Sequence, residues 1–177
     1  MVEIGCGVGW HPIQYATSFP DRNVLAIERT AKKFRSFAQR IETHTELHNR
    51  LCGVHADAVS FIDETLTESM VDEVWILYPN PEPKKATKRW FQNPFMARLT
   101  ETMKPGATLH FATNLPYYAQ ECRDRAAACG FSIEHDYVFN KMSAPGWKPR
   151  THFEKKYLER ADTLFDFKLR LKGSSND

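Results

Sequence analysis

The sequence predicts an α/β fold built on a doubly wound, mostly parallel β-sheet. Three observations predict this class. Short apolar runs of strand length alternate with amphipathic segments of helix length through most of the chain. A glycine-rich turn joins the first apolar run to the first helical segment. The 177 residues are 42% hydrophobic and 26% charged, which suits one globular domain with a substantial core, expected over residues 1–177.

The glycine turn follows a minimal strand expected at residues 2–4 and reads Gly5-Cys6-Gly7-Val8-Gly9. Glycines at alternate positions permit a tight turn and a close approach of the backbone to a ligand. A helix over residues 10–18 follows, with Pro12 near its start. Strand, turn and helix together predict the opening of a nucleotide-binding unit. The GxGxG spacing differs from the GxGxxG of NAD-dependent dehydrogenases and disfavours that class.

Acidic residues follow the second and third expected strands. The second strand, residues 24–27, ends on Glu28, whose carboxylate suits both hydroxyls of a ribose. Alternatively, Glu28 is an N-terminal charge on the following helix, residues 30–43. The third strand, residues 51–54, precedes Asp57 and a helix over residues 58–66.

His44 and His48 lie four residues apart, so they could share one face of a helix, as a pair of metal ligands must. No third ligand is evident near them in the sequence, and HTELH is not the HExxH motif of zinc enzymes. We therefore expect both to be surface histidines and expect no metal cofactor.

The fourth strand, residues 74–78, has the composition of a strand that is buried on both faces. Alternating prolines then fix the backbone and stop the strand at Tyr78 or Pro79. Asn80 is thereby held on a stiff turn at the carboxyl edge of the sheet, where open α/β folds bind ligands. The loop extends to about Asn93, and ordered loops of this length tend to be functional.

The remaining elements are expected from periodicity and stop signals. They are a helix over 94–103 stopped by Lys104-Pro105-Gly106, a strand over 108–112, a helix over 117–129 stopped by Gly130, a strand over 131–138, a loop over 139–151 and an antiparallel strand over 165–169. Residues 173–177 are expected to fray.

The net charge of +2 is unevenly distributed. Residues 82–92 carry a net charge of +3 and residues 141–160 carry +4, so the remainder carries −5. Aromatic residues are interleaved with these cations, namely Trp90, Phe91, Trp147, Phe153 and Tyr157. The combination favours RNA, whose bases stack on aromatic faces, although burial explains Phe91 and Phe153 equally well.

Two further features of the sequence indicate where in the cell the protein is located. No apolar run approaches the roughly 20 residues of a membrane span, so no membrane contact is expected. Four cysteines without CxxC spacing indicate reduced thiols and a cytoplasmic protein.

The glycine turn EIGCGVG, Glu28 and the Asp57-Ala58 step resemble the class I methyltransferase superfamily. Three further motifs resemble the bacterial tRNA (guanine-N7-)-methyltransferase family, over nearly the whole chain: ILYPNPEPKK followed by KRWFQNPF, LHFATNLPYYA and RTHFEKKYLERA. The resemblance implies the Rossmann-like fold of class I methyltransferases that use S-adenosylmethionine (SAM), a seven-stranded sheet with a C-terminal antiparallel strand. It also implies methylation of a guanine N7 in tRNA by a monomer or homodimer, with S-adenosylhomocysteine as product. Because Met1 lies at the first strand, we expect the family's N-terminal extension to be absent.

The resemblance also implies site residues. Residues expected to hold SAM are Glu3, Gly5, Cys6, Gly7, Gly9, Glu28, Arg29, Asp57, Ala58 and Asn80. Residues expected to contact the substrate are Lys84, Asn114, Thr151, His152, Phe153 and Glu154. Asn80 is the expected catalytic residue.

The chain has Asn80 and Asn114 where the family pattern has Asp. Guanine N7 carries an in-plane lone pair and no proton, so its methylation mainly needs positioning rather than a general base. Asn80 can donate to O6 beside N7, as Asn and Gln do to bases. It can also accept from an amino group, as in the NPPY turn of amino-group methyltransferases. Two alternatives therefore stay open: an RNA-binding protein with impaired catalysis, and an amino-group methyltransferase acting on another nucleic acid.

Overall fold

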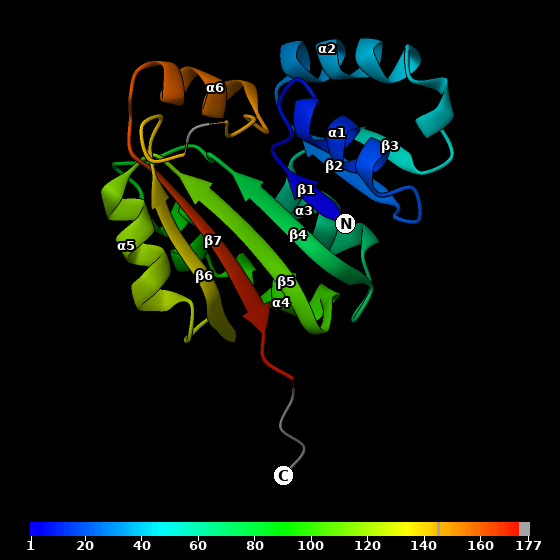
Figure 1. Ribbon diagram of the computed structural model, residues 1–177. Helices are drawn as coiled ribbons and strands as arrows, with labels where there is room; N and C mark the ends of the chain where they lie inside the picture. Colours follow the sequence, from blue (N-terminus) through cyan, green and yellow to red (C-terminus); the bar gives the residue numbers. More distant parts are fainter. Residues whose placement is uncertain (145, 174–177) are drawn as a thin grey trace.

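The computed structural model describes residues 1–144 and 146–173, which form a seven-stranded sheet of order β3-β2-β1-β4-β5-β7-β6 (Figure 1). The strands are β1 (Val2–Ile4), β2 (Val24–Glu28), β3 (Leu51–His55), β4 (Val71–Leu77), β5 (Met103–Thr113), β6 (Phe131–Phe139) and β7 (Leu164–Leu171). Strand β7 runs antiparallel to both β5 and β6, and the pairs from β3 to β5 are parallel. The predicted fold class is therefore confirmed. Gly173 follows β7, and the rest of the segment expected to fray lies outside the described residues.

Six α-helices are described: α1 (Trp10–Ser18), α2 (Ala31–Glu42), α3 (Ala58–Thr65), α4 (Phe95–Thr102), α5 (Pro116–Arg125) and α6 (His152–Glu159). Short 3₁₀ turns lie at η1 (Thr45–Leu47), η2 (Ala86–Lys88) and η3 (Trp90–Gln92). In residues 1–144 and 146–173, no helix reaches the length and hydropathy that a bilayer crossing requires.

The two faces of the sheet carry separate cores. Alternation along β1 points Val2 and Ile4 into a core that also contains Ile62 of α3, Leu99 of α4 and Tyr118 of α5. On the opposite face, a smaller core joins α1 and α2 to β2 and β3. A third apolar cluster packs Leu158 of α6 against the carboxyl ends of β4 and β5. Helix α6 therefore lies across the edge where parallel strands end, as Figure 1 shows.

The structure differs from the sequence prediction at three elements. Strand β5 begins at Met103 rather than residue 108, and its register on β4 shifts between Val71 and Glu73 to accommodate the Lys104-Pro105-Gly106 stretch. Helix α5 ends at Arg125, because the chain turns there to bring Phe131 into β6. Helix α6 was not predicted at all.

Candidate active site

The glycine turn after β1 is tied to the end of β2 by Glu28. Gly5, Gly7 and Gly9 all have positive φ angles, of 78°, 62° and 83°. Glu28 is only 5% exposed, and its two carboxylate oxygens accept from the backbone N–H of Gly7 at 2.9 Å and of Thr30 at 2.6 Å. The carboxylate therefore fixes both the turn and the start of α2, and each oxygen keeps a lone pair for another donor.

The glycines of the turn have two different structural roles. A Cβ atom at Gly9 would lie 2.0 Å from the ring of Phe37, so this glycine permits α2 to pack against the turn. At Gly5 and Gly7 a Cβ atom would meet no heavy atom within 4 Å, so both face open space. A nucleoside or amino-acid group can therefore approach the backbone here, beside the Glu28 carboxylate.

The segment after β3 provides a second acidic group. Asp57 caps α3, since its Oδ1 accepts from the backbone N–H of Val59 at 3.0 Å. Its Oδ2 lies 3.7 Å from Arg29, and both side chains are largely exposed. Ala58 begins α3 and is half-buried. Strands β2 and β3 are adjacent and parallel, so the carboxyl ends that carry Glu28 and Asp57 lie at the same edge.

Two residues of the expected SAM set are buried and point elsewhere. Glu3 is 2% exposed, and one of its oxygens lies 2.8 Å from Nδ1 of His11. The thiol of Cys6 is also buried, and this burial, reinforced by Glu3 and Glu28, raises its pKa. Cys6 is thus a neutral side chain, and its backbone shapes the turn, since its N–H donates to Ile27 at 3.1 Å and its carbonyl accepts from Gly9 at 3.1 Å.

The turn that carries Asn80 follows β4, which pairs directly with β1. It therefore begins beside the glycine turn at the carboxyl edge. Tyr78 takes up the left-handed region at φ 52°, an uncommon conformation for a bulky residue. Asn80 is exposed, and its Nδ2 donates to Oε1 of Glu82 at 2.9 Å.

The substrate residues expected near this turn differ in accessibility. Lys84 is exposed on the loop after Asn80, whereas half-buried Asn114 donates to Asp162 at 3.2 Å. Arg89, which the sequence groups with the basic segment, forms a 2.6 Å ion pair with buried Glu121. Arg89 therefore holds the loop against α5 rather than contributing a free cation.

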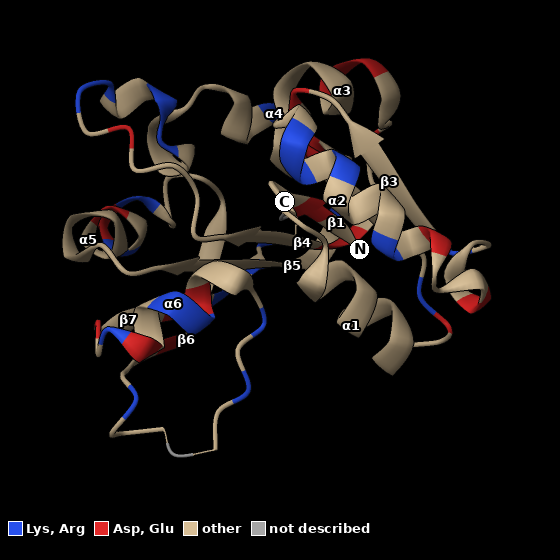
Figure 2. Ribbon diagram, turned by 90° about the horizontal axis from the view of Figure 1, so that it is seen from above, with Lys and Arg blue, Asp and Glu red and all other residues tan. Residues whose placement is uncertain are grey.

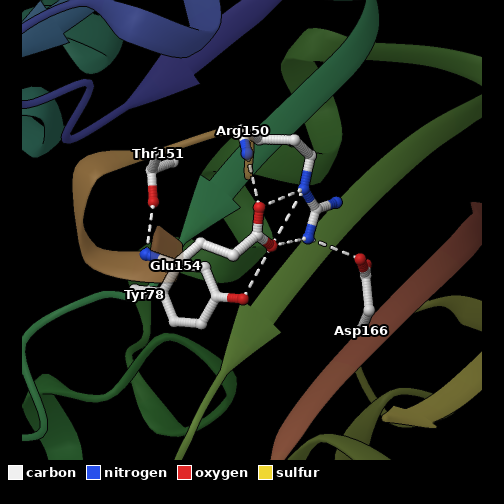
Figure 3. Close-up of polar contacts among 5 residues, drawn as sticks. All are labelled: Tyr78, Arg150, Thr151, Glu154 and Asp166. Carbon is white, nitrogen blue, oxygen red and sulfur yellow. Dashed lines mark hydrogen bonds and ion pairs between the residues drawn. The ribbon is translucent and has the colours of Figure 1, made fainter. Parts of the chain in front are cut away.

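The motif RTHFE proves to be the start of α6, and its polar side chains are largely committed to structure (Figure 3). Thr151 is the N-cap, with its Oγ1 accepting from the backbone N–H of Glu154 at 3.0 Å. Glu154 is completely buried, where it accepts from Tyr78 at 2.8 Å and from Arg150 at 2.6 Å. The same nitrogen of Arg150, Nη2, also lies 2.5 Å from Oδ2 of Asp166 on β7. The burial of Glu154 argues against direct contact with a substrate.

The two carboxylates that share Arg150 have opposite pKa shifts. At Glu154, burial alone would raise the pKa, but Arg150 and the hydrogen bonds outweigh it, and the pKa lies below its ordinary value. At Asp166, burial is the larger influence and raises the pKa despite Arg150. Glu154 also receives the larger share of the Arg150 donors, namely its backbone N–H, Nε and Nη2, whereas Asp166 receives Nη2 alone among the described contacts.

The exposed residues of α6 reach the half of the sheet that carries the glycine turn. His152 meets Trp10 edge to face with ring centroids 5.7 Å apart. Lys33 of α2 lies 5.0 Å from the ring centroid of Phe153, which is 38% exposed. Helix α6 thus bridges the glycine-turn side and the Asn80 side of the carboxyl edge.

Among the aromatic residues expected to meet RNA, burial separates two groups. Phe91 is 3% exposed and belongs to the main core, so it is a structural residue. Trp147 is 42% exposed and lies on the loop before α6, with its ring close to Arg150. Trp147 and Phe153 are therefore the exposed members of this set, each with a cation over one side of its ring.

A third basic segment, which sequence reasoning missed, lies on α2. Residues 29–40 contain Arg29, Lys32, Lys33, Arg35 and Arg40 and no acidic residue. Figure 2 looks onto the carboxyl edge and shows Lys and Arg positions on α2, on α6 and on the flanking loops. The positive charge of residues 29–40 is evident only when this segment is counted alone. Counted together with the rest of the chain outside residues 82–92 and 141–160, it disappears in a net negative charge.

His44 and His48 turn their rings back onto α2. Nδ1 of His44 lies 2.8 Å from the carbonyl oxygen of Arg40, and Nε2 of His48 lies 3.1 Å from that of Ile41. His48 is exposed and His44 is half-buried. Within the described part of the chain, no cluster of three or more His, Cys, Asp or Glu residues is placed to hold a metal ion.

Comparison with known proteins gives a consistent result. A family model described as "Putative methyltransferase" matches residues 1–167. The tRNA (guanine-N(7)-)-methyltransferase of Nitrosomonas eutropha is 29% identical over 170 residues, which cover 94% of this chain and 73% of the relative.

Solved structures share the fold. An antibiotic-related methyltransferase has a TM-score of 0.72 at 14% identity, with 96% of this chain and 86% of that chain covered. The [4+2]-cyclase SpnF has a TM-score of 0.68 at 13% identity, with 98% and 74% covered. Because one of these neighbours is named a cyclase, the structural likeness shows the fold alone.

Proposed function

Since the chain belongs to the methyltransferase family whose model matches residues 1–167, we propose that it transfers a methyl group from SAM to N7 of a guanine in tRNA. The observation that carries the proposal is the composition of the carboxyl edge. Glu28 and the open glycine turn lie on one side, the Asn80 turn follows the adjacent strand, and basic segments surround them. We propose that residues 1–177 act as one domain in the cytoplasm, where tRNA is found.

The residues around the glycine turn fit SAM. Gly5 and Gly7 offer backbone with open space beside it, and Glu28 keeps free lone pairs for ribose hydroxyls. Asp57 is exposed at the end of the neighbouring strand, where its Oδ2 can accept from an adenine amino group. Arg29 and Ala58 flank this site. Glu3, Cys6 and Gly9 support the turn from its buried side, through His11, the smaller core and Phe37.

The chemistry at N7 requires alignment of a lone pair with an activated methyl group. SAM, when bound, supplies a methyl group on a positively charged sulfonium. Asn80 lies on the turn that separates the cofactor side from the basic loop, and one of its amide N–H groups can donate to guanine O6 beside N7. The protein contributes positioning and exclusion of water, because no proton must be removed before attack.

The proposed substrate contacts fall into two groups. Lys84, His152 and Phe153 are exposed and can meet phosphate and base directly, and half-buried Asn114 lies at the end of β5. Thr151 and Glu154 act indirectly, because they fix the start of α6 and so place His152 and Phe153. Trp147, together with the cations of α2, extends the proposed tRNA surface.

Methylation of unmodified tRNA with labelled SAM, followed by nucleoside analysis, tests the proposal. The expected product is 7-methylguanosine, and an Asn80→Ala variant of the same purity serves as control. A methylated amino group on any base would instead support the amino-group alternative. Binding of tRNA and SAM without any methylated product would support the RNA-binding alternative.

A further inference from the structure

The turn after β4 contains a second polar residue that the proposed function does not use. The carboxylate of Glu82 accepts a hydrogen bond from Nδ2 of Asn80 at 2.9 Å. Glu82 also adopts φ 41°, so it lies in the left-handed region that non-glycine residues rarely occupy. Together with Tyr78 at φ 52°, it places a left-handed residue on each side of Asn80. Such backbone is retained only where the surroundings hold it, and it concentrates at functional sites.

Contacts on both sides hold the turn in this shape. On the upstream side, Tyr78 is anchored by its backbone N–H to Ala112 at 2.8 Å and by its hydroxyl to buried Glu154. On the downstream side, the hydroxyl of Tyr117 donates to the carbonyl of Pro81 at 3.2 Å, and Nη1 of Arg89 lies 3.4 Å from the carbonyl of Glu82. The side chain of Glu82 is therefore directed at Asn80 by a braced backbone.

The carboxylate of Glu82 fixes the orientation of the Asn80 side-chain amide. An ionised carboxylate only accepts hydrogen bonds, so the NH₂ group of Asn80 must point toward it and the carbonyl oxygen away. One N–H of the amide is then committed to Glu82, while the second N–H keeps a fixed direction. An amide without this partner would interchange its donor and acceptor ends freely.

We propose that Glu82 is a positioning residue for methyl transfer, because it orients the Asn80 amide so that its second N–H meets the target base. The inference rests on the proposed function and deepens it, since a fixed donor beside N7 selects a base with an acceptor at the neighbouring position. Guanine has O6 there, whereas adenine has an amino group. Glu82 thus contributes to the choice of guanine through Asn80, without touching the base.

Steady-state kinetics on tRNA separate this role from a structural one. Glu82→Ala should lower kcat about tenfold, the effect of one hydrogen bond to a charged group, with KM values for SAM and tRNA changed less than about threefold. Glu82→Gln can donate as well as accept, so it no longer forces the NH₂ group of Asn80 toward it, and its kcat should fall between those of wild type and Glu82→Ala. The double variant Asn80→Ala/Glu82→Ala should be no slower than Asn80→Ala alone, because Glu82 acts through Asn80. Glu68→Ala, an exposed carboxylate on another turn, is the matched control.

A spectroscopic readout tests the orientation without activity. The side-chain amide resonances of Asn80, identified as the pair that Asn80→Ala removes, should shift in Glu82→Ala and not in Glu68→Ala. Unchanged amide resonances, or equal kcat values for Glu82→Ala and wild type, would overturn the inference while 7-methylguanosine formation by the wild type still upholds the proposed function. A wild type that makes no 7-methylguanosine would refute the proposed function, and the amide resonances would then decide the orientation on their own. A Glu82→Gln variant as fast as wild type would also contradict it, since an acceptor-only side chain would then not be needed.

Discussion

The hydroxyl of Tyr78 donates a hydrogen bond of 2.8 Å to Glu154, which lies 76 residues later in the chain and is completely buried. This bond joins the turn that carries Asn80 to the helix that carries His152 and Phe153. The proposed catalytic turn and the proposed tRNA surface are therefore held together by one buried carboxylate and its partner Arg150.

The carboxylates on Arg150 should differ in their contribution to stability. Glu154→Gln should reduce the free energy of unfolding by about 3–5 kcal/mol, because it breaks a buried ion pair and leaves the Arg150 charge poorly compensated. Asp166→Asn should cost less, because Asp166 has one contact with Arg150, whereas Glu154 has three donors from Arg150 and the hydroxyl of Tyr78. Chemical denaturation of the two variants at neutral pH measures both values, and equal losses would contradict the assignment.

Glu28 should dominate cofactor affinity. Glu28→Ala should weaken SAM binding by roughly 1.5–3 kcal/mol, the range of a hydrogen bond to a charged group. Glu28 also accepts hydrogen bonds from the backbone N–H groups of Gly7 and Thr30, so Glu28→Ala disturbs the turn as well. Glu28→Gln keeps an acceptor oxygen and therefore preserves more of the turn's hydrogen bonding than Glu28→Ala does. Calorimetry on both variants, with circular dichroism to check folding, makes the measurement. Unchanged affinity would remove Glu28 from the site.

The basic loop should control the salt dependence of RNA binding. Replacing Lys84, Lys85 and Lys88 together by Ala should reduce the slope of log K against log salt by about 2–3, because each phosphate contact releases counterions. Arg89 is excluded from this set because it is paired with Glu121. Filter binding across a salt series gives the slope.

Cations at the opposite edge provide the control for that experiment. Arg22 precedes β2 and Lys172 follows antiparallel β7, so both lie at the amino edge of the parallel strands. Arg22→Ala/Lys172→Ala should leave the slope unchanged. A drop in slope for this pair equal to that for the loop lysines would place the RNA elsewhere.

Asn80→Asp alone should not improve turnover, despite the advantage that a carboxylate has in stabilising a cationic product ring. The new carboxylate would lie at hydrogen-bond distance from that of Glu82, and the two charges would repel each other. Asn80→Asp/Glu82→Gln removes the conflict and should exceed Asn80→Asp alone in kcat. A single Asp variant faster than wild type would show that the two side chains do not meet in solution.

Glu73 on β4 should give the protein an acid-labile contribution to stability. Burial would raise its pKa, but hydrogen bonds from His110 at 3.0 Å and from Tyr15 outweigh burial and lower the pKa to about 2. A carboxyl group whose pKa is lowered in the folded state stabilises the fold at pH values above its ordinary pKa of 4.5. This contribution is lost as the pH falls from about 4.5 to about 2. Glu73→Gln should therefore cost roughly 3 kcal/mol at neutral pH and little near pH 2. Chemical denaturation of the wild type and of Glu73→Gln at several pH values tests whether their free energies of unfolding converge near pH 2.

The sequence predicted most of the fold because its local signals agree with the tertiary structure. Apolar runs and glycine signals located β1 to β4 within a few residues, and the helix over residues 10–18 matches α1 completely. The start of β5 was misplaced because Pro105-Gly106 is a strong stop signal, which the irregular pairing with β4 overrides. Helix α6 has a signal of its own, Thr151 followed by Glu154 as in a capping box, but the segment was treated only as a family motif.

The site was predictable only in part. Glycine spacing and strand-end acids indicated where a cofactor would approach, since these depend on local backbone. The role of Glu154 was not predictable, because its partners at positions 78, 150 and 166 meet only after the sheet has formed. The same holds for Glu82, since its left-handed backbone depends on contacts from Arg89 and Tyr117.

The antiparallel strand β7 also has a consequence for synthesis of the protein on the ribosome. Strand β6 is joined to the sheet through β7 alone, although β7 follows it by more than twenty residues. While residues 164–171 remain inside the exit tunnel, β5 and β6 each present an edge that cannot yet be paired. Exposed edges of this kind recruit other chains, so the nascent protein is prone to aggregate until β7 emerges and pairs with both.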